Sequence, residues 1–364
     1  MRIGVLRERL SGERRVALIP DSVARLTKGG HEVSVQLDAG TAAGFSDAQY
    51  QAAGATIAPD GRTAADADLV LAVRRPSMEQ VAMLREGSVL IALLQPATAT
   101  ELVTALGRRK VKGLSLERVP RITKAQSMDV LSSQSTVAGY KAALIGASEL
   151  VKFLPMLTTA AGTIAPARAF ILGAGVAGLQ AIATTRRLGA IVSAFDIRPA
   201  AAEQVQSLGA SFVASEAVAQ DAETAGGYAR QQTEDEQART LTTIGKHIVD
   251  QDLVITTALI PGRPAPRLIT GDMVRGMRPG SVIVDIAAEA GGNCELTKPD
   301  ETVEVNGVTI LGPTNLPSTV PLHASQMFSR NLETLIKHLA PEGALALNEQ
   351  DEIVSAMLLS APPS

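Results

Sequence analysis

Three closely spaced glycines follow an apolar run in the middle of the chain. Phe170–Leu172 is typical of a buried strand, and Gly173, Gly175 and Gly178 come directly after it. In a dinucleotide-binding turn the first glycine bends the strand, the second lets backbone amides approach a pyrophosphate, and the third lets the next helix pack closely. The helix N-terminus then faces the phosphates. The pattern predicts a dinucleotide site, although Gly/Ala-rich turns also occur in plain helix–strand packing.

An acidic residue ends the next apolar run and strengthens this prediction. Asp196 follows Val192–Phe195, eighteen residues after Gly178. A carboxylate at this position accepts hydrogen bonds from ribose hydroxyls and repels a 2′-phosphate, which favours NAD. Arg198, two positions later, weakens that preference because a guanidinium can accommodate a phosphate.

A second polar segment, residues 121–134, could orient a nicotinamide. Asp129 or Ser132 could simply cap a following helix. A cap does not explain Arg121 together with Gln126, since a guanidinium fork and a carboxamide are what orienting a carboxamide and a ribose requires. None of the four is an obvious general base. Direct hydride transfer between two carbon atoms needs none, because the protein supplies orientation and excludes water.

The elements that must position these residues follow a β/α alternation. Short apolar runs alternate with helical stretches over the first 120 residues and again over 169–285. Helices are expected at Val130–Phe153 and Leu322–Leu339 as crossings between domains. We therefore predict an α/β protein with two doubly wound, parallel-sheet Rossmann-like domains and a cleft between them. The first domain is expected over 1–131 plus 322–364, and the NAD-binding domain over 132–321.

Composition supports this fold and excludes several classes. The 364 residues exceed what one core needs, and 46% are hydrophobic but only 2% aromatic, which suits aliphatic helices on parallel strands. A net charge of −3 gives no reason to expect nucleic acid or an anionic membrane surface. The single Cys294 excludes an internal disulfide and is expected to be a small buried residue. The four histidines show no metal spacing, and no apolar run suits a signal peptide or membrane span, so a cytoplasmic chain is expected.

A long polar insertion separates two of the expected elements. Residues 222–240 are predicted to form a mobile loop, because Gly226-Gly227 could act as a hinge beside Tyr228. The loop could close over the nucleotide as a lid. The alternative is a solvated loop with an incidental tyrosine.

With these motifs in place, the chain resembles the proton-translocating NAD(P) transhydrogenases, specifically their soluble NAD(H)-binding domain, which some bacteria make as a separate first alpha-subunit polypeptide. The resemblance covers nearly the whole chain. Its most specific segments are RITKAQSMDVLSS (121–133), TAAGTIAP (159–166), VAGLQAIAT (176–184), Gly226-Gly227-Tyr228, ITTALIPG (255–262) and EAGGNC (289–294).

The resemblance implies an activity and an assembly. The expected protein is a homodimeric peripheral subunit of a Re/Si-specific, proton-translocating enzyme, and it passes hydride from NADH to NADP(H) held by another subunit. Its partners would be the NADP-binding and membrane-spanning subunits, with no nucleic acid and no direct membrane insertion. It would be cytoplasmic and peripheral to the inner membrane through the complex.

The resemblance also assigns residues, position by position. The nicotinamide half and hydride transfer fall to Arg121, Gln126, Asp129 and Ser132, with Gln126 also facing the partner's nucleotide. The full set expected to bind NAD(H) is Arg121, Gln126, Ser127, Met128, Asp129, Ser132, Gly173, Gly175, Val176, Gly178, Asp196, Ile197, Arg198, Gly227, Tyr228, Ala258 and Leu259. No metal is expected.

Two other functions stay open at this point. Alanine dehydrogenase shares the fold and the opening pattern Arg15–Pro20, but needs a lysine and a histidine for its substrate. This chain has Arg74-Arg75-Pro76 and Gln95-Pro96 at those places, and glutamine cannot serve as a general base. The third possibility is an NAD-binding regulator without turnover.

Overall fold

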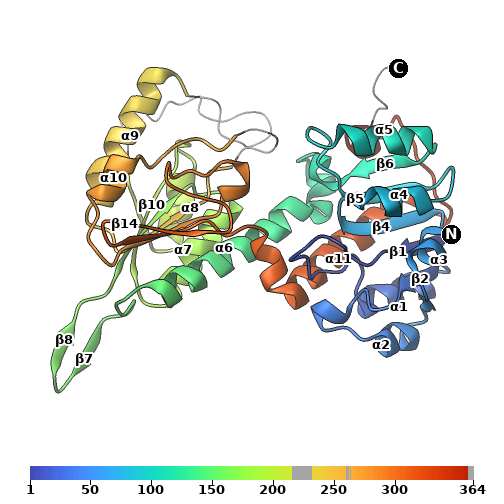
Figure 1. The fold of residues 1–364 in the computed structure, drawn as a ribbon, viewed down its shortest axis with the longest axis horizontal. Coiled ribbons are helices and arrows are strands. Elements are labelled where there is room, and N and C mark those ends of the chain that lie inside the picture. The colour runs from blue at the N-terminus through green and yellow to red at the C-terminus, as the bar shows by residue number, and fades with distance from the viewer. Residues whose placement is uncertain (215–231, 260–261, 263, 360–364) are drawn as a thin grey trace. The chain divides into compact units, whose positions relative to one another are not determined.

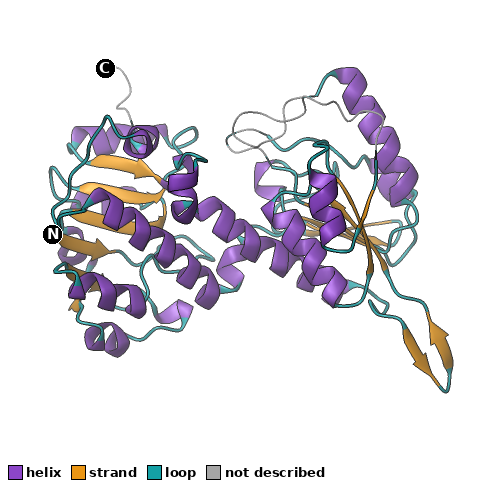
Figure 2. Ribbon diagram, turned by 180° about the vertical axis from the view of Figure 1, so that it is seen from behind, coloured by secondary structure: helices purple, strands orange, loops and turns teal. Residues whose placement is uncertain are grey.

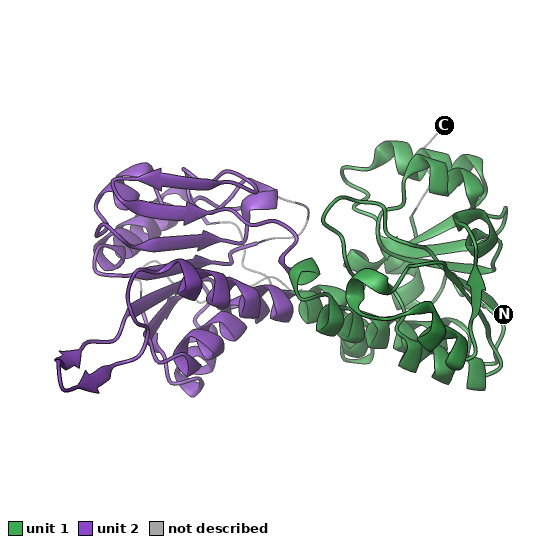
Figure 3. Cartoon of the chain, turned by 60° about the horizontal axis from the view of Figure 1, so that its bottom comes forward, with its two compact units in different colours: residues 1–134, 317–364 green, residues 135–316 purple. Residues whose placement is uncertain are grey.

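The computed structural model describes residues 1–214, 232–259, 262 and 264–359 (Figure 1). The chain divides into two compact units. Unit 1 comprises Met1–Gln134 and Pro317–Ser364, and unit 2 comprises Ser135–Leu316 (Figure 3). Helix α6 (Val130–Glu149) begins in unit 1 and continues into unit 2.

Unit 1 is built on a six-stranded parallel sheet of order β3-β2-β1-β4-β5-β6. The strands are β1 (Arg2–Val5), β2 (Glu32–Gln36), β3 (Thr56–Ala58), β4 (Leu69–Arg74), β5 (Val89–Leu93) and β6 (Lys112–Ser115). The helices are α1 (Pro20–Lys28), α2 (Asp47–Ala52), α3 (Gly61–Ala65), α4 (Met78–Met83), α5 (Thr100–Arg108), α11 (Pro321–Leu339) and α12 (Glu352–Met357).

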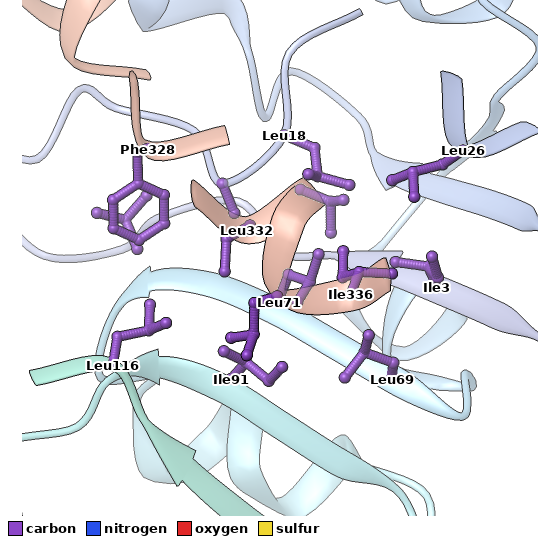
Figure 4. Packing of buried hydrophobic residues seen from close by; sticks show 14 of the residues in the cluster. Ile3, Leu18, Leu26, Leu69, Leu71, Ile91, Leu116, Phe328, Leu332 and Ile336 are labelled. Carbon is purple, nitrogen blue, oxygen red and sulfur yellow. The ribbon is translucent and has the colours of Figure 1, made fainter. Parts of the chain in front are cut away.

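Both faces of this sheet are buried, as a parallel sheet requires. Alternate residues of β4 enter different clusters: Leu69 and Leu71 face one, while Val70 faces the other. Helix α11 supplies Leu332 and Ile336 to the first cluster, where they pack over the strands (Figure 4). Burial on both faces of the sheet therefore explains why the strands are near-continuous aliphatic runs in the sequence.

Unit 2 repeats this plan with one addition. Its seven-stranded sheet has the order β11-β10-β9-β12-β13-β15-β14, and only β14 is antiparallel to its neighbour. The strands are β9 (Arg168–Leu172), β10 (Ile191–Phe195), β11 (Ser211–Phe212), β12 (Leu253–Thr256), β13 (Val282–Asp285), β14 (Thr302–Val305) and β15 (Val308–Leu311). The further helices are α7 (Val176–Arg187), α8 (Ala201–Ser207), α9 (Glu234–Ile248) and α10 (Gly271–Arg275).

A separate two-stranded hairpin, β7 (Leu157–Thr159) and β8 (Gly162–Ile164), extends away from the sheet of unit 2 (Figure 2). Every residue of its two strands is exposed except Leu157, which is partly buried. Among the described residues, no helix combines the length and the apolar character that crossing a bilayer would need.

The α/β prediction with parallel, Rossmann-like sheets is confirmed. Local boundaries differ. The crossing helix expected to reach Phe153 ends at Glu149, and the loop expected over residues 222–240 ends earlier, because α9 begins at Glu234. Thr233 caps α9 and forms a capping box with Glu236, and this Thr-x-x-Glu spacing is a helix-start signal in the sequence itself.

Candidate functional site

The glycine turn of unit 2 has the geometry that its spacing predicted. Gly173 adopts a φ of 97°, which favours glycine, and its N–H donates to the carbonyl of Phe195 at 2.8 Å. A Cβ on Gly178 would lie 1.8 Å from the Gly173 carbonyl oxygen, so α7 could not pack here with any side chain. A Cβ on Gly175 would meet no described atom within 4 Å. Open space therefore lies over the glycine that a pyrophosphate would approach.

The turn lies at the point where the strand order reverses. The first strand of the seven-stranded sheet in chain order, β9, lies between β10 on one side and β12 on the other. Open parallel sheets bind ligands at this switch point, outside the carboxyl ends of the strands. Helix α7 begins here with Gly175 as its N-cap, so its first-turn amides have no partners within the helix. They are suited to an anion.

Helix α7 is fixed by a second close approach, from the unit 2 part of α6. A Cβ on Gly139 would lie 2.0 Å from the carbonyl oxygen of Ala177. Gly139 therefore lets the two helices meet directly beside the start of α7. Sequence reasoning did not identify this glycine, because a single glycine within a helix gives no indication of its partner.

Asp196 is buried and holds the turn itself. One carboxylate oxygen accepts from Ala174 N at 2.7 Å and from Arg198 Nη2 at 3.0 Å, and the other accepts from Arg198 N and Nε at 2.9 and 3.0 Å. This carboxylate was expected to receive ribose hydroxyls. In the structure its acceptors already engage the turn and Arg198, so a ribose hydroxyl must share them or displace the guanidinium.

We expect Asp196→Ala to change nucleotide preference. The variant leaves Ala174 N without its acceptor and removes the carboxylate that would compete with a 2′-phosphate for the Arg198 guanidinium. NADH affinity should fall about tenfold, while NADPH affinity should fall less or rise. Titration of both nucleotides by calorimetry checks this. Asp252→Ala is a matched control, because Asp252 accepts from Arg168 N at 2.8 Å at the opposite, amino ends of the strands. An unchanged ratio of the two affinities in Asp196→Ala would contradict the prediction.

The segment after β12 lies against the glycine turn. Thr257 Oγ1 donates to the Gly173 carbonyl at 3.0 Å, and a Cβ on Gly173 would lie 3.2 Å from Ala258 N. Beside them, Leu259 is 42% exposed and Val176, at the start of α7, is 40% exposed. Exposed aliphatic side chains next to a polar turn suit contact with the rings of a nucleotide. Ile197 is half-buried after β10.

In unit 1, the polar segment forms the 3-10 helix η3 (Thr123–Met128) and then enters α6. Arg121, Gln126 and Ser127 are exposed. Met128 is only 4% exposed and its side chain packs in the core of unit 1, so its expected nucleotide contact, which stays a prediction, falls to its backbone. Helical spacing places Ala125 and Met128 on the inner face of η3, an amphipathic signal that could have been found in the sequence.

Asp129 and Ser132 are brought together at the start of α6. Asp129 accepts from Ser132 N at 3.0 Å and from Ser132 Oγ at 2.6 Å. This is the capping role considered above as an alternative. The candidate residues thus form two groups: the segment from Arg121 to Ser132 belongs to unit 1, and the glycine turn with Asp196 and Leu259 belongs to unit 2. Gly227 and Tyr228 lie outside the described residues.

Unit 1 also holds a buried charged cluster that sequence reasoning missed. The Arg15 guanidinium donates from Nε and Nη2 to Glu13, at 2.8 and 2.7 Å, and from Nη1 to Gln134 at 2.8 Å. The side chains of Arg15 and Glu13 are 2% and 0% exposed. Arg74 Nε approaches Glu13 at 3.9 Å. Arg74, the first residue of the Arg74-Arg75-Pro76 stretch, therefore lies beside an internal carboxylate.

Glu8 belongs to the same region and titrates unusually. Its carboxylate accepts from Val73 N at 2.7 Å and Arg74 N at 3.2 Å. Burial, with a smaller contribution from the charge of Glu13, raises the pKa of the Glu8 carboxyl to about 7, although the hydrogen bonds from Val73 and Arg74 and the charge of Arg15 lower it. The native state therefore holds this proton more strongly than the unfolded chain does.

We expect Glu8→Gln to remove a pH dependence of stability. Since the native pKa lies above the unfolded one, stability is greatest below pH 4.5 and is lost as the pH rises through 7, by about 2–3 kcal/mol. Urea unfolding at pH 5 and pH 8 measures this loss, which the variant should lack. Glu117→Gln is the control, because Glu117 likewise accepts from the backbone of Leu94 and Gln95. An equal loss in Glu8→Gln and wild type would contradict the assignment.

Cys294 and His247 both lie in unit 2, where their surroundings indicate a packing role. Cys294 is buried, as expected, and burial raises the pKa of its thiol. His247 Nε2 lies 2.8 Å from Ser193 Oγ, its ring meets Phe170 edge-on, and burial lowers its pKa. In the part of the chain that the structure describes, no three histidine, cysteine or acidic side chains are grouped as metal ligands.

The fold and the glycine turn define a Rossmann-type α/β protein with a nucleotide-binding turn in its second unit. The chain belongs to the alanine dehydrogenase/PNT family. Residues 4–138 match the family's N-terminal domain and residues 142–361 match its C-terminal domain. The resemblance inferred from the motifs is thereby confirmed.

Within this family, the chain is more similar to the two transhydrogenases described next than to the alanine dehydrogenase that follows them. The first of the polypeptides that form the NAD(P) transhydrogenase alpha subunit of Rhodospirillum rubrum is 47% identical over 364 residues, covering 98% of this chain and 95% of that protein. The crystal structure of a transhydrogenase from Sinorhizobium meliloti superposes with a TM-score of 0.91 at 44% identity, covering 99% of this chain and 98% of that one. Alanine dehydrogenase of Bacillus subtilis is 34% identical over 333 residues, 88% of this chain and 81% of that protein.

Proposed function

We propose that this chain is the NAD(H)-binding subunit of a proton-translocating NAD(P) transhydrogenase. It exchanges hydride directly between its own NAD(H) and NADP(H) held by a partner subunit. The observation that carries the proposal is the glycine turn at the switch point of unit 2, with open space over Gly175 and α7 amides facing it. The 47% identity to a transhydrogenase alpha-subunit polypeptide over nearly the whole chain supports the choice of reaction.

The residues of unit 2 fit a bound dinucleotide. The amides at the start of α7 would hold the pyrophosphate. The Asp196–Arg198 pair, beyond the end of β10, would hold the adenosine side. Leu259 and Val176 would cover the rings and exclude water. The bound nicotinamide supplies the hydride chemistry, and the chain supplies its position.

The polar residues of unit 1 would orient the nicotinamide for hydride transfer. Arg121 offers a fixed fork of donors, and the Gln126 carboxamide offers both a donor and acceptors. The Asp129–Ser132 pair fixes two polar groups at the start of α6. Because hydride passes between two carbon atoms, no acid or base is required, and correct placement is what lowers the barrier.

Amino acid oxidation is less consistent with these side chains. Gln95 occupies the place of the alanine dehydrogenase histidine, and its backbone N–H donates to Glu117. A glutamine cannot accept a substrate proton near neutral pH. The partner subunits, the homodimer and the peripheral association with the inner membrane belong to this proposal as the family resemblance implies them.

The proposal is tested by mixing the chain with the NADP-binding subunit of its complex and following reduction of an NADP analogue by NADH. We expect turnover only in the mixture, and NADH binding by the chain alone. Pyruvate-dependent NADH oxidation by the isolated chain would instead indicate alanine dehydrogenase. NADH binding without turnover in either assay would indicate a regulator.

A further inference from the structure

The loop after β13 contains an asparagine that no functional assignment above includes. Asn293 is fully buried, in a loop that returns to the carboxyl end of β13. Asp285, at the end of that strand, fixes the loop by accepting from Cys294 N at 2.9 Å and Thr297 Oγ1 at 2.7 Å. It also accepts from Thr256 Oγ1 at 2.8 Å, which ties the loop to the end of β12. Asn293 is therefore held firmly.

The carboxamide of Asn293 is used entirely on the backbone of the neighbouring loop. Its Oδ1 accepts from Ala258 N at 3.0 Å, and its Nδ2 donates to the carbonyls of Ala258 and Pro266 at 2.9 and 2.8 Å. Both backbone groups of Ala258 are thus bound by one side chain. A carboxamide is the side-chain group that can bracket a backbone N–H and C=O in this way, since it carries a donor and an acceptor together.

The residue that Asn293 holds lies at the nucleotide turn. Ala258 follows β12 and lies beside Gly173, joined through Thr257 Oγ1, which donates to the Gly173 carbonyl. A dinucleotide spans the switch point, and its adenosine half belongs with Asp196 on the β10 side. The nicotinamide half then falls on the β12 side, where Ala258 and Leu259 lie.

We infer that Asn293 is a positioning residue for the nicotinamide half of the bound nucleotide, acting through the backbone of Ala258. The inference rests on the proposed function. It does not make Asn293 a catalytic residue, because the side chain is buried and reaches the site only through Ala258. Loss of its hydrogen bonds should let the Ala258–Leu259 segment shift while the glycine turn, held by Asp196 and Thr257, keeps its shape.

The test compares two ligands on one variant. Asn293→Asp keeps the shape and the acceptor for Ala258 N, but loses both donations from Nδ2 and places an oxygen against two carbonyls. NADH affinity should fall about tenfold or more, while adenosine diphosphate ribose, which lacks the nicotinamide, should bind within about threefold of wild type. At saturating NADH, the rate of hydride transfer to the NADP analogue should also fall. Calorimetry and the mixed-subunit assay measure these effects.

Gln251→Leu is the matched control, since Gln251 is another buried carboxamide of unit 2, and it donates to the His247 carbonyl, away from the turn. It should lower stability without separating the two ligands. If Asn293→Asp does not fold, Asn293→Ser carries the same comparison. Equal weakening of both ligands, or wild-type affinity for both, would overturn the inference and leave the proposed function standing. Failure of wild type to bind NADH would overturn both.

Discussion

Gly178→Ala should destabilise unit 2 and abolish NADH binding. The added Cβ would lie 1.8 Å from the Gly173 carbonyl oxygen and 2.8 Å from its carbonyl carbon, both backbone atoms at the apex of the turn. Neither can move without breaking the hydrogen bond from Gly173 N to the Phe195 carbonyl or the one from Thr257 Oγ1. Overpacking of this kind costs about 3 kcal/mol and displaces α7 from the turn. Urea unfolding and NADH titration measure the two effects.

Gly175→Ala should weaken NADH binding without destabilising the fold, unlike Gly178→Ala in the same turn. Its φ of −76° suits any residue, and no described atom lies within 4 Å of the added Cβ. The variant should therefore unfold within about 0.5 kcal/mol of wild type, yet lose NADH affinity about tenfold or more, because the methyl group occupies the space that the pyrophosphate approaches. Wild-type NADH affinity in Gly175→Ala would show that the nucleotide does not use this turn. Wild-type stability in Gly178→Ala would show that α7 packs differently.

The sequence predicts these glycine roles because each depends on local geometry. A sharp turn after a strand and a helix packed onto it leave the same spacing wherever they occur. The parallel α/β fold is predictable for a related reason, since burial on both faces makes each strand a continuous aliphatic run. Asp196 is a partial success: its place after β10 is correct, but its hydrogen bonds to Ala174 and Arg198 depend on how the loop folds back.

Hydrogen bonds between residues far apart in the chain could not be predicted from the sequence. Arg15 and Gln134 are 119 positions apart, and Asn293 reaches Ala258 across 35, so no local pattern joins them. Met128 illustrates a different limit. It lies within a motif that resembles a nucleotide-binding segment, yet half of a short amphipathic helix must face the core, and Met128 is on that half. The motif therefore supplies side chains to the core of unit 1 as well as exposed polar groups.

Gln126→Leu should lower the rate of hydride transfer by about tenfold to a hundredfold, while NADH affinity changes less. Gln126 is exposed on η3, and its neighbours Ala125 and Met128 anchor that helix in the core, so the substitution removes a polar group without removing packing. Binding energy that persists while the rate falls means that an orienting interaction has been lost. The mixed-subunit assay with an NADP analogue gives the rate at saturating NADH, and calorimetry gives the affinity.

Thr123→Val is the matched control for Gln126→Leu. Thr123 is also exposed on η3, but belongs to no candidate group, so its substitution should leave both rate and affinity within about twofold. A large loss in both variants would mean that η3 itself had been disturbed. A wild-type rate of hydride transfer in Gln126→Leu would contradict the prediction. Orientation of the nicotinamide would then depend on Arg121 and the Asp129–Ser132 pair alone. A selective loss of rate in Gln126→Leu would make this carboxamide the group that holds the two nicotinamides in register, since it alone among the candidates of unit 1 is assigned to both.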